Sequence, residues 1–208
     1  MFTEKIITKT GYIETTLPFT YYNKLLLNIN SYEFSDGVDH LLAGVIETEK
    51  KFSIYSIPEE IREIIIRGCH TYNSTFGHNI FLDPPPKYKL EFINTWINFQ
   101  KKYEYNPAHH HSGDLVFVIW IKIPYKLQDE LNHPSSIMSN SGAASKFQFT
   151  NISNKFSNIS KNLLDIDESF EGKMIIFHSK MEHTVYPFFT SDEYRISMSG
   201  NLKIVFEE

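Results

Sequence analysis

A run of nine residues at positions 115–123, all apolar except Lys122, places the strongest restriction on how this chain can fold. The run reads Leu-Val-Phe-Val-Ile-Trp-Ile-Lys-Ile, so it lacks the apolar and polar alternation of a strand with one solvated face. β-Branched and aromatic residues dominate it, which favours a strand over a helix. The sequence therefore predicts a central strand that is covered on both faces.

The remaining elements are predicted in two blocks, with helices before strands. Apolar spacing indicates helices at about 18–32 and 56–72, and the second has Pro58 and acidic residues at its start. After the triple proline at 84–86, strands are predicted at 92–99, 147–149, 172–177 and 194–206. This order indicates an α+β, mainly β protein, whose closed or sandwich-like core protects the edges of its strands.

One domain is expected across residues 1–208, with a mainly helical flank at 1–90 and a β core at 91–208. Residues 1–14 suit a short strand or an unfixed terminus, and the class of the run at 40–46 stays open. The segment around 132–162 is rich in Ser and Asn. It is predicted to be a long loop with one short strand inside it, of the kind that covers a binding site.

Composition argues against several partners and locations. The formal charge of −5, without a cluster of Lys and Arg, makes nucleic acid an unexpected partner. The longest apolar run is about half of the roughly 20 residues that a membrane-spanning helix needs, so no membrane span is expected. Cys69 is the only cysteine and no export signal is visible, which favours a reducing, cytoplasmic location. No pattern indicates an oligomeric state.

Histidines and an acid just before the central strand are candidate metal ligands. His109 and His111 are two residues apart, so their side chains project to the same side of an extended segment. Asp114 could turn inward as a carboxylate ligand, because Gly113 permits a turn. The distant His183 would complete the set of two histidines and one carboxylate that leaves open positions on Fe(II).

The last predicted strand offers an anion site to accompany such a metal. Arg195, Ser197 and Ser199 lie on one face of that strand, since alternate residues of a strand share a face. An arginine buried on an inward face needs an anion, and its planar fork of N–H donors suits a carboxylate.

His183, followed after eleven residues by Arg195-Ile-Ser197, resembles the carboxy-terminal signature of the iron(II)/2-oxoglutarate-dependent oxygenases. With segments 96–98 and 106–114, it is similar to small, uncharacterised members of that superfamily in bacteria and phages. The resemblance implies a double-stranded β-helix (jelly-roll, cupin-like) core with Fe(II) and 2-oxoglutarate as cofactors. It also implies that Arg195 and Ser197 hold the far carboxylate of 2-oxoglutarate, and that the reaction is a hydroxylation that consumes O2 and releases succinate and CO2. For a phage-encoded protein, the cytoplasm would be that of the host.

The ligand set departs from the usual His-X-Asp of that superfamily. The favoured assignment is His111, Asp114 and His183, with His109 as a replacement or a support, and His109, His111 and His183 is the next choice. His111-Ser-Gly113 is also similar to the His-X-Gly of the aspartyl/asparaginyl β-hydroxylases, which have no carboxylate ligand at that position. Three further histidines are expected to have surface or packing roles: His110, His133 and His178.

Two other functions compete with the oxygenase. A cupin-like metal-binding protein or isomerase would use the same barrel without 2-oxoglutarate chemistry, since His-X-His, an acid and a later histidine also describe cupin metal sites. Arg195 and Ser197 favour the oxygenase, because cupins do not require that pair. A structural or interaction module with incidental histidines is the third possibility. The sequence does not indicate whether the substrate is a small molecule or a protein side chain.

Overall fold

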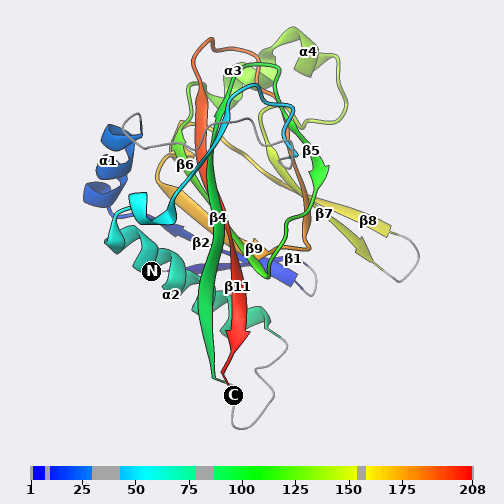
Figure 1. The fold of residues 1–208 in the computed structure, drawn as a ribbon. Helices are drawn as coiled ribbons and strands as arrows, with labels where there is room; N and C mark the ends of the chain where they lie inside the picture. The colour runs from blue at the N-terminus through cyan, green and yellow to red at the C-terminus, as the bar shows by residue number, and fades with distance from the viewer. Residues whose placement is uncertain (1, 8–9, 30–42, 78–86, 154–157, 208) are drawn as a thin grey trace.

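Two antiparallel sheets make up most of the computed structural model, which describes all residues except 1, 8–9, 30–42, 78–86, 154–157 and 208 (Figure 1). The larger sheet has the strand order β1-β2-β9-β6-β11-β4-β3, and the smaller has the order β5-β10-β7-β8. The strands of the larger sheet are β1 (Thr3–Ile7), β2 (Thr10–Thr16), β3 (Glu49–Phe52), β4 (Tyr88–Gln100), β6 (Leu115–Lys122), β9 (Lys173–His178) and β11 (Arg195–Phe206). Those of the smaller sheet are β5 (Asn106–His109), β7 (Phe147–Ser153), β8 (Asn158–Leu164) and β10 (Glu182–Val185).

Strands β4 to β11 form a double-stranded β-helix. β4, β6, β9 and β11 are neighbours in the larger sheet, and β5, β10, β7 and β8 form the smaller one. The chain passes repeatedly from one sheet to the other, so the two sheets face each other around a shared interior. The expected class, α+β and mainly β with a jelly-roll core, is confirmed.

The central strand β6 is buried on both faces, as its composition predicts. Leu115, Phe117 and Ile119 pack on the helix side of the larger sheet. Val116, Val118 and Trp120 pack between the two sheets, against residues such as Phe147, Phe149 and Phe177. Because helices cover one face of β6 and the smaller sheet covers the other, an apolar residue is suitable at nearly every position.

Two helices cover the outer face of the larger sheet (Figure 1). α1 (Phe19–Asn28) and α2 (Glu59–Phe76) contribute Leu25, Ile61 and Ile65 to the core beneath them. α2 begins directly after Pro58, as predicted, and extends four residues beyond the expected end at 72. Residues 30–32 of the first expected helix lie outside the described part. The other short helices are η1 (Ile54–Ser56), α3 (Leu127–Asn132), α4 (Pro134–Ile137) and η3 (Glu168–Phe170).

The strand expected at 147–149 is present as part of β7, but the expectation that the rest of 132–162 is a long loop is wrong. This segment contains α4, β7 and the first part of β8, and β7 pairs with both β8 and β10. Its Ser and Asn residues were misleading, because pairing with neighbouring strands, rather than local composition, makes this segment extended. In the flank at 1–90, which was expected to be mainly helical, the described part of the segment 1–14 forms strand rather than an unfixed terminus. There, β1 and β2 form an antiparallel pair that joins the larger sheet through β9.

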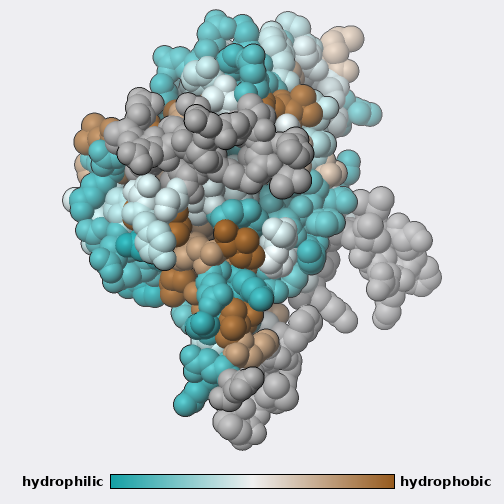
Figure 2. Space-filling model, viewed as in Figure 1, coloured by the Kyte–Doolittle hydropathy of each residue, from teal (hydrophilic) through white to brown (hydrophobic). Residues whose placement is uncertain are grey.

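Hydrophilic residues cover most of the described surface in the view of Figure 2, and hydrophobic residues form scattered patches. Of the run at 40–46, residues 40–42 lie outside the described part, and Val45 forms an isolated bridge with Tyr105. Among the described residues, no helix has the length and apolar character needed to cross a membrane.

Candidate metal centre

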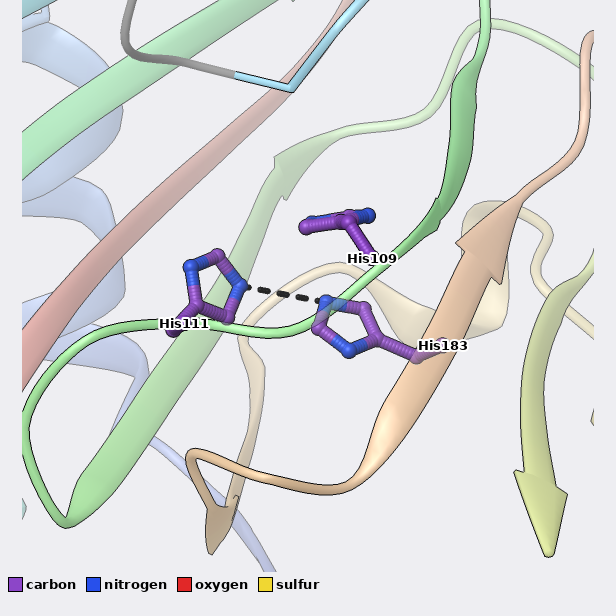
Figure 3. A group of neighbouring side chains, drawn as sticks. All are labelled: His109, His111 and His183. Atoms are coloured by element: carbon purple, nitrogen blue, oxygen red, sulfur yellow. Dashed lines mark hydrogen bonds between the residues drawn. The ribbon is translucent and has the colours of Figure 1, made fainter.

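Three histidines converge where the smaller sheet meets the loop that leads into β6. His109 ends β5, His111 follows two residues later, and His183 lies on β10 opposite His109 in the strand register. One potential ligand atom from each lies within 4.8 Å of the others. The Nε2 atoms of His111 and His183 are 3.1 Å apart. Figure 3 shows the three rings turned toward one another, two from one segment and the third from the neighbouring strand.

Local hydrogen bonds orient two of these rings. The Nδ1 atom of His109 lies 2.7 Å from Pro107 O, and the Nδ1 atom of His183 lies 3.0 Å from Met181 O. A carbonyl oxygen only accepts, so each Nδ1 carries the proton and each Nε2 keeps its lone pair. This is the tautomer in which imidazole binds a metal through Nε2. The backbone N–H of His111 donates to Ser179 O (2.9 Å), which holds the loop beside β9 and β10.

Burial keeps the three imidazoles neutral. Loss of hydration lowers the pKa of His109, lowers that of His111 to about 3, and lowers that of His183 well below its ordinary value. Mutual repulsion between the rings acts in the same direction on His111 and His183. Neutral imidazole is the form that binds metal, so no proton has to leave these rings at pH 7.

Asp114 does not join the three histidines. Its Oδ2 accepts a 2.7 Å hydrogen bond from Ile204 N, and its own N–H donates to Leu202 O. Gly113 makes the expected turn, with φ of 76°, but the turn runs against β11, where a Cβ on Gly113 would lie 2.7 Å from Leu202 O. The carboxylate therefore satisfies the backbone of β11, and the favoured set of His111, Asp114 and His183 is not assembled. The next choice, with His109, is assembled.

Aromatic side chains fix the rings from behind. His183 stacks on Phe147 with centroids 5.2 Å apart, and Phe177 meets it edge-on at 5.0 Å. His111 lies beside Trp96 at 5.4 Å. These contacts come from strands of both sheets, so the ring positions depend on the closed core.

A cavity of about 340 Å³ joins the histidines to Arg195 and Ser197. One wall is built from alternate residues of β4 and β11, which are neighbouring antiparallel strands. The register places Arg195 opposite Gln100, Ser197 opposite Asn98, Ser199 opposite Trp96, and Asn201 opposite Asn94. The prediction that Arg195, Ser197 and Ser199 share a face is correct in this geometry. The β4 residues were missed, although Asn94, Trp96, Asn98 and Gln100 alternate along the chain and could have been recognised as one face.

Arg195 is almost completely buried, with 3% of its surface exposed. Its guanidinium donates to Gln100 Oε1, Tyr125 OH, and the carbonyl oxygens of Ser145 and Tyr186. Among the described residues, no carboxylate forms an ion pair with it. Ser197 lies beside it, and its Oγ accepts a 3.4 Å hydrogen bond from Asn98. A buried cation without a paired anion fits an anionic ligand.

The donor set fits a divalent metal together with a polar ligand. Asn98, Asn106 and Asn201 line the cavity, and each has a buried amide oxygen that finds no hydrogen-bond partner among the described residues. Unsatisfied buried polar atoms are costly, so a ligand that brings hydrogen-bonding groups would lower the free energy of this wall. Three neutral imidazoles at one end and a buried cation at the other match a metal-bound molecule with a distant carboxylate.

The family model described as "Putative 2OG-Fe(II) oxygenase" matches residues 94–201, where 2OG is 2-oxoglutarate. This match spans more than half of the chain. The protein belongs to this family. The resemblance, the enzyme class and the cofactors expected from the sequence, Fe(II) and 2-oxoglutarate, are thereby confirmed. Family membership argues against both rivals, the cupin-like protein and the structural module.

Solved structures share the fold of this 2OG-Fe(II) oxygenase at low sequence identity. A Pseudomonas putida prolyl-4-hydroxylase has 10% identity and a TM-score of 0.55, over 96% of this chain and 93% of that chain. HygX from Streptomyces hygroscopicus, with nickel and 2-oxoglutarate bound, has 7% identity and a TM-score of 0.54, over 94% of this chain and 83% of that chain. An oxidoreductase of the 2OG-Fe(II) oxygenase family from Burkholderia pseudomallei has 12% identity and a TM-score of 0.51, over 91% of this chain and 84% of that chain. A search of curated proteins found no match.

Proposed function

We propose that this 2OG-Fe(II) oxygenase is a hydroxylase in which His109, His111 and His183 hold the iron. The observation that supports this ligand set is the convergence of three neutral imidazoles at one end of the cavity that contains Arg195. Asp114 is not part of the set, because its carboxylate is hydrogen-bonded to Ile204 N.

Arg195 and Ser197 would hold the far carboxylate of 2-oxoglutarate. They lie on the same wall as Ser199 and Asn201, so a molecule of this shape can extend along β11 from the histidines toward the guanidinium. When bound, iron, 2-oxoglutarate and O2 supply the oxidising power, and succinate and CO2 are released. The protein supplies metal ligation, orientation of the co-substrate and exclusion of water.

The group that is oxidised belongs to a small molecule or a protein side chain. A volume of about 340 Å³ is near the lower end of the range for small-molecule sites, roughly 300–1,000 Å³. Since 2-oxoglutarate takes part of this space, only a small portion of the substrate can enter beside it.

The test is an anaerobic titration of the Fe(II)-loaded protein with 2-oxoglutarate, followed by admission of O2. We expect a change in the visible spectrum of the iron on titration and succinate after O2 is added. Slow turnover without the true substrate is enough for this measurement. Tight binding of zinc, manganese or nickel, without any spectral change of bound iron on addition of 2-oxoglutarate, would contradict the proposal and favour the cupin-like alternative.

A further inference from the structure

Every N–H donor of Arg195 is already used inside the protein. An arginine side chain has five such donors. Nη1 donates to Tyr125 OH (2.7 Å) and Ser145 O (2.9 Å), and Nη2 donates to Tyr186 O (2.8 Å) and Gln100 Oε1 (2.7 Å). Nε donates to the same Gln100 oxygen at 3.1 Å. The guanidinium that would receive a carboxylate therefore has no free donor.

Gln100 occupies the edge of the guanidinium that matters for a carboxylate. The Nε and Nη2 groups form the parallel pair of donors to which a carboxylate binds with both oxygens. Here one amide oxygen takes both hydrogen bonds. Gln100 is buried, lies opposite Arg195 in the β4–β11 register, and lines the same cavity as the three histidines.

The other contacts of Arg195 do not compensate its charge. Tyr125 and Phe188 lie over the guanidinium at 5.9 and 5.4 Å, and all its acceptors are neutral. The buried carboxylate of Glu130 uses its oxygens on Phe189 N, Thr190 N and Thr190 Oγ1. An arriving anion would thus gain the attraction of a buried cation that has no ion-pair partner in the described part of the chain, which a neutral amide cannot equal.

We propose that Gln100 is a placeholder for the far carboxylate of 2-oxoglutarate and sets the selectivity for a dicarboxylic co-substrate. Gln100 caps the Nε and Nη2 edge in the absence of 2-oxoglutarate, and the carboxylate displaces its side chain on binding. The amide of Gln100 is otherwise held by one hydrogen bond, from Nε2 to Glu104 O in the turn after β4. A 2-oxo acid without a far carboxylate cannot replace the two hydrogen bonds, so it leaves the cap in place.

The test compares two substitutions of Gln100 in protein loaded with Ni(II) in place of Fe(II), so that binding of 2-oxoglutarate is measured without turnover. Gln100→Glu puts a permanent carboxylate on the guanidinium, and we expect at least a tenfold loss of 2-oxoglutarate affinity by calorimetry. Gln100→Met keeps the length but removes the oxygen, and we expect affinity equal to or above that of the unmodified protein. Gln148→Glu is the matched control, because Gln148 is also a buried glutamine but bonds to Tyr186 OH and Thr150 rather than to Arg195.

A second probe separates the placeholder from a general effect of the new charge. 2-Oxopentanoate has the chain of 2-oxoglutarate with a methyl group in place of the far carboxylate. We expect it to bind weakly and with the same affinity, within threefold, to the unmodified protein and to Gln100→Glu. Circular dichroism of each variant checks folding, and Gln100→Met decides the question if Gln100→Glu does not fold.

Three results would overturn the proposal. One is 2-oxoglutarate affinity of Gln100→Glu within threefold of the unmodified protein. Another is a tenfold loss of 2-oxoglutarate affinity in Gln100→Met, which would show that Gln100 is a direct ligand of 2-oxoglutarate. The third is absence of 2-oxoglutarate binding to the unmodified protein. Because this inference rests on the proposed function, that result would contradict both the role of Gln100 and the proposed function. The first two results would remove the role of Gln100 alone.

Discussion

The two ends of the cavity are prepared for their ligands in opposite ways. At the metal end, formed by His109, His111 and His183, the rings are neutral and turned toward one another, and one potential ligand atom from each lies within 4.8 Å of the others. At the anion end, formed by Arg195 and Gln100, every donor of the cation is already satisfied. We infer that the metal binds to a preformed site, whereas the carboxylate binds by displacing the side chain of Gln100.

This difference has an energetic reason. Three neutral imidazoles close together cost little in the absence of metal, because none carries a charge that requires a partner. A buried guanidinium with unused donors would cost several kcal/mol, roughly the penalty of an unpaired buried charge. Hydrogen bonds that the guanidinium donates to neutral acceptors reduce that cost until an anion arrives.

The largest effect is expected at the metal end. His183→Ala removes one of three ligands, so we expect metal affinity to fall more than about 100-fold, since loss of even a supporting group costs about 10–100-fold. His70→Ala is the control, because His70 is exposed on α2 and bonds to Tyr88. Metal content after dialysis against a fixed free-metal concentration measures the change. Unchanged metal content in His183→Ala would show that the histidine cluster is incidental.

At the anion end, removal of the charge should cost stability as well as binding. Arg195→Ala leaves Gln100 Oε1, Tyr125 OH and Tyr186 O without the guanidinium as donor, whereas Ser145 O keeps its hydrogen bond from Tyr125 OH. We therefore expect the free energy of unfolding to fall by about 3–5 kcal/mol. Urea denaturation of the metal-free protein measures this. In whatever fraction remains folded, 2-oxoglutarate affinity equal to that of the unmodified protein would contradict the role of Arg195.

Acid should destabilise the metal-free protein through the metal end. The folded state depresses the pKa of His109, His111 and His183, whereas the unfolded chain protonates them below about pH 6.5. The free energy of unfolding therefore falls as pH decreases below 6.5, by at most about 1.4 kcal/mol per pH unit for each histidine. His111→Gln should reduce this slope by the contribution of one group between pH 6.5 and 5. An identical dependence of the free energy of unfolding on pH in both proteins would show that the pKa of His111 is not depressed in the folded state.

The smallest effect is expected at Asp114. Asp114→Asn keeps an acceptor for Ile204 N but removes the charge, so we expect a loss of about 1 kcal/mol in stability. Metal affinity should stay within threefold of that of the unmodified protein, because the carboxylate does not face the histidines. A loss of metal comparable to that in His183→Ala would return Asp114 to the ligand set.

Several features of the fold and the site could be predicted from sequence because their causes are local. The composition of the β6 segment indicated burial on both faces, and Pro58 with the following acids marked the start of α2. Residues two positions apart in an extended segment project to the same side, which correctly predicted that His109 lies beside His111 and Arg195 beside Ser197. The resemblance of the carboxy-terminal residues to one superfamily then indicated the enzyme class, which the family match confirms.

Other features depend on contacts between segments that are distant along the chain. Only strand pairing made 147–153 and 158–164 extended despite their Ser and Asn content. Only the approach of Gly113 to β11 decided that Asp114 bonds to Ile204 rather than turning toward His183, because a free backbone N–H lay within its reach. Gln100 could not be connected with Arg195 from sequence, since the β4–β11 register brings them together across 95 positions. Sequence alone thus determined which chemical groups the protein carries, and tertiary structure decided which of them meet, because a carboxylate or an amide bonds to whichever partner the packing places nearest.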